Sequence, residues 1–224
     1  MIELYNMDNM GFSLEGKPAD LIFADYIYED MNFAWAEKYW SNLKVGGIFI
    51  GMTDYHSVAE FKVFMKNLPD ANFVNWLIWK NEFGNFRKDR FRQCHDDIII
   101  FSKGKNFKFY SDRVQVEKAT ANSKGLNPSG RTTKLATSVI TDICLTTVAK
   151  ERVKKDDGHL VRWQKPQELY QRLMLPFTDE GDLIVDPFAG TGSLGLWAKR
   201  NNRNYVGIEN DKEVFKLAQK NIGS

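Results

Sequence analysis

One stretch near the C-terminal end limits the possible folds more than any other. Residues 182–211 read DLIVDPFAGTGSLGLWAKRNNRNYVGIEND, an apolar strand followed by a glycine turn, a helix, a second strand and an acid. Gly190, Gly192 and Gly195 have the spacing G-x-G-x-x-G, and Glu209 ends the second strand 17 residues after Gly192. A glycine turn lets a ligand approach the backbone, and the helix after it presents free N–H groups. An acid ending the next strand can accept hydrogen bonds from ribose hydroxyls, so the unit predicts a nucleotide-type site in an α/β fold.

Two ligands suit this unit: a dinucleotide or S-adenosylmethionine. A dinucleotide fold usually begins with such a unit and continues through several further strands. Here only one predicted helix, residues 212–222, follows Glu209, so the other strands must come from the N-terminal half. This order favours S-adenosylmethionine, and a nicotinamide-dependent oxidoreductase is the rival interpretation.

The rest of the chain predicts an alternation of strands and helices. Ser57 and Glu60 have the spacing of a capping box, Pro166 opens a helix at its first turn, and the Val-Gly-Gly at 45–47 ends another helix. Residues 105–160 show no clean period and suggest an insertion. The predicted strands are 20–26, 48–52, 73–81, 96–104, 182–186 and 204–209, and the predicted helices are 33–44, 57–68, 165–177, about 193–200 and 212–222. Alternation of this kind predicts an α/β fold with a largely parallel sheet.

A second acid follows an apolar strand near the start of the chain. The stretch DLIFADY at 20–26 runs into Asp25-Tyr26-Ile27-Tyr28. Because the carboxyl ends of parallel strands share one crevice, we expect Asp25 to face the same site as the glycine turn.

In chain order these motifs resemble the β group of amino-methylating DNA methyltransferases, which carry the catalytic motif first, a recognition segment next and the cofactor motif last. The resemblance covers most of the chain. Its matching segments are LYNMD (4–8), NWLIWKN (75–81), DDIIIFSKGK (96–105), the Lys-Pro helix from 164, DPFAGTGS (186–193) and YVGIE (205–209).

The resemblance implies a Rossmann-like methyltransferase fold with a mostly parallel sheet, helices on both faces and a circularly permuted motif order. It divides the chain into a catalytic half (1–104), a target-recognition insertion (105–160) and a cofactor-binding half (161–224). It also implies S-adenosylmethionine as cofactor, with Glu209 on the ribose, Asp8 near the adenine and Lys165 with Pro166 beside the methionine end. The remaining cofactor-binding residues that it implies are Asp186, Phe188, Gly190, Thr191, Gly192 and Ser193.

The catalytic loop departs from the family pattern of Asp, Asn or Ser, then Pro-Pro, then an aromatic. This chain keeps Asp25 and Tyr28 but has Tyr26 and Ile27 in place of the prolines. By resemblance, Asp25 and the Tyr26 carbonyl would accept hydrogen bonds from the target amine, and Tyr28 would stack on a base flipped out of double-stranded DNA. An acid at the first position indicates the adenine-N6 form, whereas Ser usually accompanies cytosine-N4. The lost prolines leave a binding-only relic and a cytosine-N4 enzyme as alternatives.

The Lys-Pro motif departs as well. The family's usual His-x-Thr-Gln-Lys-Pro reads Val-Arg-Trp-Gln-Lys-Pro at 161–166, so Trp163 directly precedes the Gln-Lys-Pro run.

The distribution of charge points to a nucleic-acid partner. Between Lys80 and Lys134 lie 13 basic and 6 acidic residues, whereas the rest of the chain holds 18 basic and 23 acidic ones. A solvated basic surface would explain the charge alone. The aromatic residues interleaved with it favour a segment that faces DNA. These aromatic residues are Phe83, Phe86, Phe91, Phe107, Phe109 and Tyr110.

Composition and cysteine content indicate the cellular compartment in which we expect this chain. The chain is 43% hydrophobic, and no apolar run approaches the roughly 18–20 residues of a membrane span. Its two cysteines lack metal-ligand spacing and favour a reducing compartment over a disulfide framework. The three histidines show no metal-ligand spacing either. We therefore expect a cytoplasmic protein, in a prokaryotic or phage-infected cell by the resemblance, with no membrane partner. A monomer and a homodimer fit the sequence equally well.

Overall fold

The computed structural model describes residues 1–14, 16–26, 31–81, 88–119, 129–144, 151–154, 158, 161 and 163–223. Its strands are β1 (Ile2–Asn6), β2 (Ala19–Asp25), β3 (Leu43–Thr53), β4 (Ala71–Lys80), β5 (His95–Lys103), β6 (Gln115–Glu117), β7 (Thr133–Leu135), β8 (Val139–Ile140), β9 (Leu183–Asp186) and β10 (Asn204–Glu209). Its helices are α1 (Ala34–Ser41), α2 (Val58–Lys66), the 3-10 turn η1 (Ser111–Val114), α3 (Gln167–Met174), α4 (Ser193–Arg200) and α5 (Lys212–Gly223).

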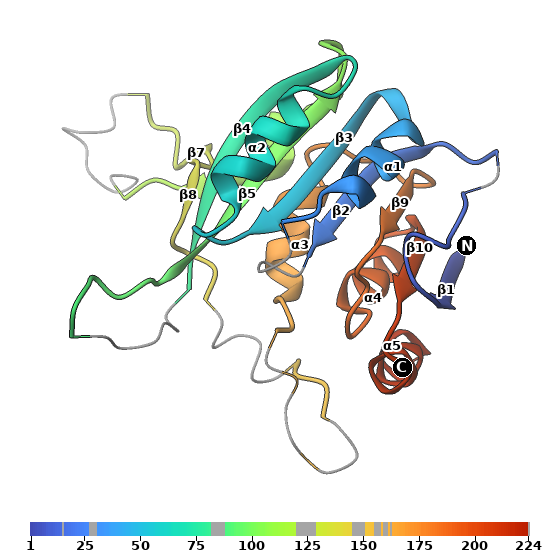
Figure 1. Ribbon diagram of the computed structural model, residues 1–224. Coiled ribbons are helices and arrows are strands. Elements are labelled where there is room, and N and C mark those ends of the chain that lie inside the picture. Colours follow the sequence, from blue (N-terminus) through green and yellow to red (C-terminus); the bar gives the residue numbers. More distant parts are fainter. Residues whose placement is uncertain are drawn as a thin grey trace.

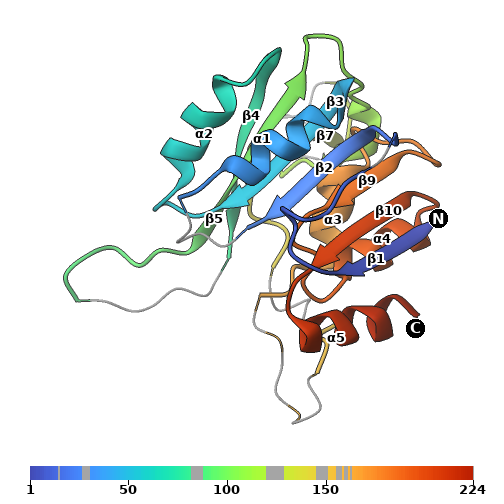
Figure 2. The same cartoon turned by 45° about the vertical axis from the view of Figure 1, so that its right-hand side comes forward.

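Eight strands form the central sheet, in the order β1-β10-β9-β2-β3-β5-β4-β8 (Figure 1). The run from β1 to β3 is parallel throughout, and β5 is antiparallel to both β3 and β4. The prediction of a mostly parallel α/β sheet is therefore confirmed. The strands of the C-terminal glycine unit, β9 and β10, lie between β2 and β1 from the start of the chain (Figure 2).

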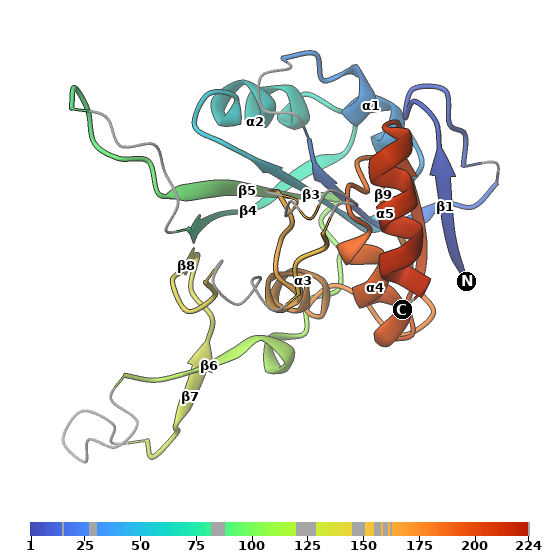
Figure 3. The ribbon, with the colours of Figure 1, turned by 90° about the horizontal axis from the view of Figure 1, so that it is seen from below.

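Helices cover both faces of this sheet. One face packs against α1 and α2, and the other against α3, α4 and the end of α5 (Figure 3). The pleat of β2 divides its side chains accordingly: Ile22 and Ala24 point to the first face, and Leu21 and Phe23 to the second. Buried on both faces, β2 reads as the continuous apolar run that marked it in the sequence.

Two local expectations were wrong, and one strand was not predicted. Residues 45–47 do not end a helix but lie inside β3, where a Cβ on Gly46 would meet the Asn106 carbonyl oxygen at 2.8 Å. Residues 2–6 form the edge strand β1, which pairs with β10 and was not among the predicted strands. Ser57 precedes α2 but makes no capping hydrogen bond, because its hydroxyl is engaged elsewhere in the core.

The segment 105–160 contributes to the core in part. The described residues there include η1, a small β6-β7 ribbon and β8, which extends the sheet beside β4. Trp79 of β4 donates its indole N–H to the Ile143 carbonyl at 2.8 Å, and both residues are buried. Among the described residues, none of the helices is long and apolar enough to cross a membrane.

Candidate active site

A cavity of about 560 Å³ opens where the parallel strands β2, β9 and β10 end. Its volume lies within the range of small-molecule sites. The walls come from both ends of the chain: the end of β2, the turn after β9, the end of β10 and the segment leading into α3. The lining residues are Met7, Asn9, Phe23, Asp25, Tyr26, Val161, Trp163, Gln164, Lys165, Tyr170, Asp186, Pro187, Phe188, Ala189, Gly190, Thr191, Ile208, Glu209, Asn210 and Val214.

The glycine turn forms one wall, and its glycines serve different purposes. Gly190 and Gly192 have φ angles of +51° and +69°, which favour glycine. Gly195 lies inside α4, where a Cβ would meet Ile222 at 2.6 Å and Tyr205 at 2.8 Å. Two glycines therefore shape the turn, and the third lets α4 pack closely against β10 and α5.

Glu209 connects the end of β10 to this turn. Its carboxylate accepts the Gly190 N–H at 2.9 Å through one oxygen and the Asp211 N–H at 2.9 Å through the other. Burial raises the pKa of Glu209 above its ordinary value, and these backbone N–H groups oppose the shift. The acid predicted to hold a ribose thus also fixes the turn beside the cavity.

Asp186, the last residue of β9, is buried at the base of the turn. It accepts the Phe188 N–H at 3.1 Å and the Tyr205 hydroxyl at 3.1 Å. Burial raises the pKa of Asp186 to about 7, although both hydrogen bonds lower it. An acid of this kind binds a proton more tightly in the folded state than in the unfolded one.

This proton makes stability depend on pH. Between about pH 4 and pH 7 folded Asp186 keeps a proton that the unfolded chain has lost. The stability that this bound proton contributes is therefore lost as pH rises through this range. The free energy of unfolding should fall by up to about 4 kcal/mol from this group, and Asp186→Asn should remove that part of the slope. Urea unfolding from pH 4 to 8 measures it. Asp179→Asn is the control, because the Tyr110 hydroxyl and ion pairing hold the pKa of Asp179 at about 2. Its contribution to stability changes only below about pH 4, so this variant should leave the slope between pH 4 and pH 8 unchanged. Parallel profiles for Asp186→Asn and the unaltered protein would contradict the assignment.

Asp25, the last residue of β2, also lines the cavity and pairs with Lys165. The Lys165 ammonium donates to one Asp25 carboxylate oxygen at 2.7 Å, and the two side chains are 8% and 20% exposed. The same ammonium reaches the Trp163 carbonyl at 3.5 Å. The prediction placed Lys165 beside the methionine end of a cofactor, and the structure brings it to the candidate catalytic acid.

A further acid, Asp96 of β5, lies in the electrostatic field of this pair. Burial raises the pKa of Asp96 to about 6, while Lys165 lowers it and Asp25 raises it. The sequence reading did not single out Asp96, since an acid at the start of a strand is unremarkable by itself. Only the pairing of β5 with β3 brings it near Asp25.

Three of the other predicted site residues also line the cavity. Phe188, Thr191 and Tyr26 line it, whereas Gly192, Ser193, Pro166 and Asp8 do not belong to its lining. Asp8 is exposed and accepts the Met10 N–H at 2.7 Å, and its neighbours Met7 and Asn9 line the cavity instead. Tyr28 lies outside the described residues, so its predicted role stays a prediction.

The sequence reading missed several lining residues. Asn210 directly follows the predicted acid, and Val214 lies in the first turn of α5, so position next to a motif was the available signal. Trp163 stood out only by its place before the Lys-Pro pair. It is 77% exposed at the cavity, unlike the fully buried Trp79 and Trp197.

Comparison with known proteins identifies the group to which this arrangement belongs. The model of the DNA methylase family, which covers N6 and N4 methyltransferases, matches residues 5–220. Type II methyltransferase M.HpaI of Haemophilus parainfluenzae is 30% identical over 205 residues, which are 88% of this chain and 60% of that protein. Type II methyltransferase M.HinfI of Haemophilus influenzae is 28% identical over 204 residues, which are 89% of this chain and 53% of that protein. The chain thus spans between half and two thirds of the length of these relatives.

Two solved structures share the fold. The M1.HpyAVI–SAM complex superposes with a TM-score of 0.74 at 20% identity, covering 100% of both chains. The PvuII DNA methyltransferase, described as cytosine-N4-specific, superposes with a TM-score of 0.64 at 14% identity, covering 97% of this chain and 85% of that one. Because the family model matches nearly the whole sequence, the chain belongs to the N6/N4 DNA methylase family.

Proposed function

We propose that this chain carries the methyl-transfer site of a DNA amino-methyltransferase that uses S-adenosylmethionine and modifies the N6 amine of adenine. One observation carries the proposal: Asp25 from the start of the chain and the glycine turn with Glu209 from its end line one cavity. Family membership supports the same reaction class.

The residues of the cavity suit this cofactor. Gly190 has no side chain, so a ligand can approach the backbone of the turn closely. Glu209 offers carboxylate oxygens where the ribose hydroxyls of the cofactor would lie. Phe188, Ile208 and Val214 supply apolar surface for a purine ring. When bound, S-adenosylmethionine supplies an electron-poor methyl group on a positively charged sulfur.

Asp25 would act on the target amine. The nitrogen lone pair of an exocyclic amine is delocalised into the ring, so acceptors placed on its N–H groups make the nitrogen a better nucleophile. In the proposed step nitrogen bonds to the methyl carbon, the carbon–sulfur bond breaks, and one N–H proton leaves toward the Asp25 carboxylate. The Tyr26 carbonyl would be the second acceptor. The Lys165 ammonium offsets the negative charge of Asp25 in this partly buried site.

The basic segment between Lys80 and Lys134 is divided by the fold. Its later part serves the far end of the sheet, where Lys103 donates to three backbone carbonyls and Lys108 pairs with Asp179 and Asp182. Phe107 and Phe109 of this later part pack against Phe177, and the Tyr110 hydroxyl donates to Asp179. Their predicted role toward nucleic acid stays a prediction, and Phe83 and Phe86 lie outside the described residues. The loop residues 88–94 lead into the start of β5, which pairs with the end of β3 on the cavity side of the sheet.

We assign this loop segment, residues 88–94, to the DNA interface. Lys88, Arg90 and Arg92 are exposed there, and Phe91 between the two arginines is fully exposed. Basic side chains that neutralise phosphates make affinity fall with salt, and an exposed aromatic ring offers a face for a base.

The loop assignment gives a salt-dependence prediction. The double variant Lys88→Gln/Arg92→Gln should weaken DNA binding and reduce the slope of log affinity against log salt by roughly 2. Lys105→Gln, which alters an exposed lysine at the far end of the sheet, should leave the slope unchanged. Fluorescence anisotropy with a mixed-sequence duplex at 50–300 mM salt gives both values. An unchanged slope in the double variant would remove the loop from the DNA interface.

Product analysis tests the proposed function as a whole. Incubation with labelled S-adenosylmethionine and mixed-sequence duplex DNA, followed by digestion to nucleosides, should yield N6-methyladenine. N4-methylcytosine would assign the alternative base. Cofactor and DNA binding without any methylated nucleoside would identify a binding-only relic. The division into segments 1–104, 105–160 and 161–224 stays a prediction, as do base flipping and the oligomeric state.

A further inference from the structure

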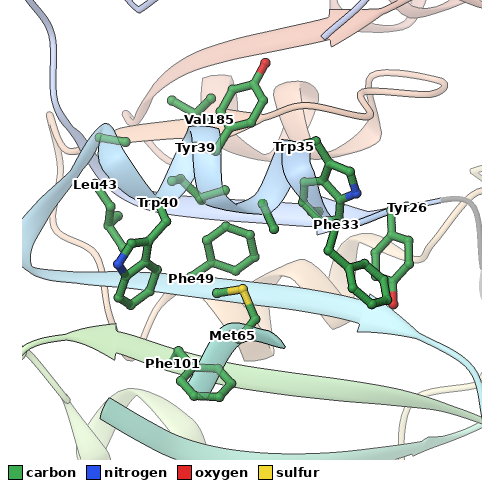
Figure 4. Packing of buried hydrophobic residues seen from close by; sticks show 14 of the residues in the cluster. Tyr26, Phe33, Trp35, Tyr39, Trp40, Leu43, Phe49, Met65, Phe101 and Val185 are labelled. Carbon is green, nitrogen blue, oxygen red and sulfur yellow. The ribbon is translucent and has the colours of Figure 1, made fainter. Parts of the chain in front are cut away.

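The residue that replaces the first proline of the family loop has an unusual environment. Tyr26 follows Asp25 directly, and its ring lies in the core, 3% exposed, among Phe33, Trp35 and Phe61 at centroid distances of 5.1–5.9 Å. Figure 4 shows the ring beside Phe33. The side chain thus points away from solvent, while the preceding carboxylate faces the cavity.

The Tyr26 hydroxyl closes a buried ring of three hydroxyl groups. It donates to Thr53 Oγ1 at 2.8 Å and lies 3.0 Å from Ser57 Oγ, and these two oxygens are 2.6 Å apart. Each hydroxyl has one proton to donate and can accept from its neighbour, so a cyclic arrangement satisfies all three. The Asp54 carbonyl, 3.5 Å from Thr53 Oγ1, is a more distant second acceptor. Burial raises the pKa of Tyr26, which keeps the phenol protonated as a donor.

The ring of hydroxyl groups joins Tyr26, directly after β2, to the end of the neighbouring strand β3. Thr53 ends β3 and Ser57 precedes α2, and Asp25 pairs with Met52 in the β2-β3 register. An anchored Tyr26 side chain constrains the backbone on both sides of its Cα. It therefore limits where both proposed amine acceptors, the Asp25 carboxylate and the Tyr26 carbonyl, can lie.

We propose that Tyr26 is a positioning residue, and that the hydroxyl ring of Tyr26, Thr53 and Ser57 holds Asp25 and the Tyr26 backbone in the geometry needed for methyl transfer. In the family pattern the fixed φ angles of two prolines would constrain this backbone. Here the buried hydrogen bonds of the Tyr26 hydroxyl, which tether it to the end of β3, would do so instead. The role rests on the proposed amine-methylating function. It accounts for Ser57 leaving the N-terminus of α2 uncapped.

Tyr26→Phe tests the tether, because it keeps the ring in the aromatic cluster and removes only the hydroxyl. Misplacement by about 1 Å costs up to about 10²-fold in rate, so kcat for methyl transfer should fall by roughly 10–100-fold. The Kd for S-adenosylmethionine should change less than about 2-fold, since neither acceptor holds the cofactor in this proposal. Thr53→Val should reproduce the loss and Thr53→Ser, which keeps the hydroxyl, should restore most of the rate. The double variant Tyr26→Phe/Thr53→Val should lose little more than either single one.

Ser102→Ala is the matched control. Ser102 is a buried hydroxyl with two hydrogen bonds, at 2.8 and 2.9 Å, at the other end of β5. It should lower the melting temperature about as much as Tyr26→Phe while leaving kcat unchanged. A folded Tyr26→Phe with the unaltered kcat, or a Thr53→Ser as slow as Thr53→Val, would overturn the proposal.

Amide hydrogen exchange gives a readout independent of catalysis. Tyr26→Phe should speed exchange in the peptide that carries Asp25 and Tyr26 by about 10-fold or more over Ser102→Ala. If the unaltered protein transfers no methyl group, the proposed function fails, and the exchange result alone decides whether the tether exists. Equal exchange in the two variants would refute it.

Discussion

Asp25→Asn is expected to lower methyl transfer to DNA by roughly 10²–10⁴-fold, the range for losing a group that acts on the reacting atoms. The amide keeps the shape of the side chain and a carbonyl oxygen for the Lys165 ammonium, which now donates to the carboxylate at 2.7 Å. It removes the negative charge and one of the two acceptors that the amine would use. Binding of S-adenosylmethionine should change little, because Asp25 acts on the amine. Single-turnover transfer of a labelled methyl group and calorimetric titration measure the two effects separately.

Asp20→Asn provides the control for this experiment. Asp20 lies at the other end of the same strand and pairs with Lys44 at 2.7 Å, so it repeats the acid–lysine pair away from the cavity. We expect no change in methyl transfer beyond its effect on stability. Asp25→Ala is a less clean variant, since it leaves a buried ammonium without its carboxylate. Full activity in Asp25→Asn would show that this acid is not catalytic.

Glu209→Ala is expected to weaken S-adenosylmethionine binding by roughly 10–100-fold. Hydrogen bonds to a charged group contribute about 1.5–3 kcal/mol, and the substitution also removes the acceptor of the Gly190 N–H at 2.9 Å. Glu209→Gln separates these causes, because its amide oxygen can still accept the Gly190 N–H. Its affinity should lie between those of the alanine variant and the unaltered protein.

Calorimetric titration measures all three affinities, and Glu180→Gln, an exposed acid outside the cavity lining, serves as the control. Cofactor affinity that does not change in Glu209→Ala would remove this acid from the site. Tight binding of a nicotinamide dinucleotide in place of S-adenosylmethionine would support the oxidoreductase interpretation instead.

The sequence alone determined the parts of the site that are local in the chain. The strand, glycine turn, helix and acid between residues 182 and 211 predicted β9, α4 and β10 with the correct bounds to within one residue. The positive φ angles of Gly190 and Gly192 are where the glycine spacing required them. Such features are encoded within a few turns of chain, so spacing and residue type suffice to predict them. Asp25 was found for the same reason, as the acid that ends an apolar strand.

Tertiary structure decided how these local parts are joined. The pair of Lys165 with Asp25 spans 140 positions, and no periodicity in either segment predicts it. Ser57 has the sequence signature of a helix cap, but its hydroxyl instead forms a hydrogen bond with Tyr26, which lies 31 residues away in the chain. The basic segment looked continuous in the sequence, yet β5 carries its two parts to opposite ends of the sheet. Each outcome depends on which strands become neighbours in the sheet, and burial of the whole core determines that order. A hydrogen bond or ion pair formed in the assembled sheet can therefore override a local sequence signal.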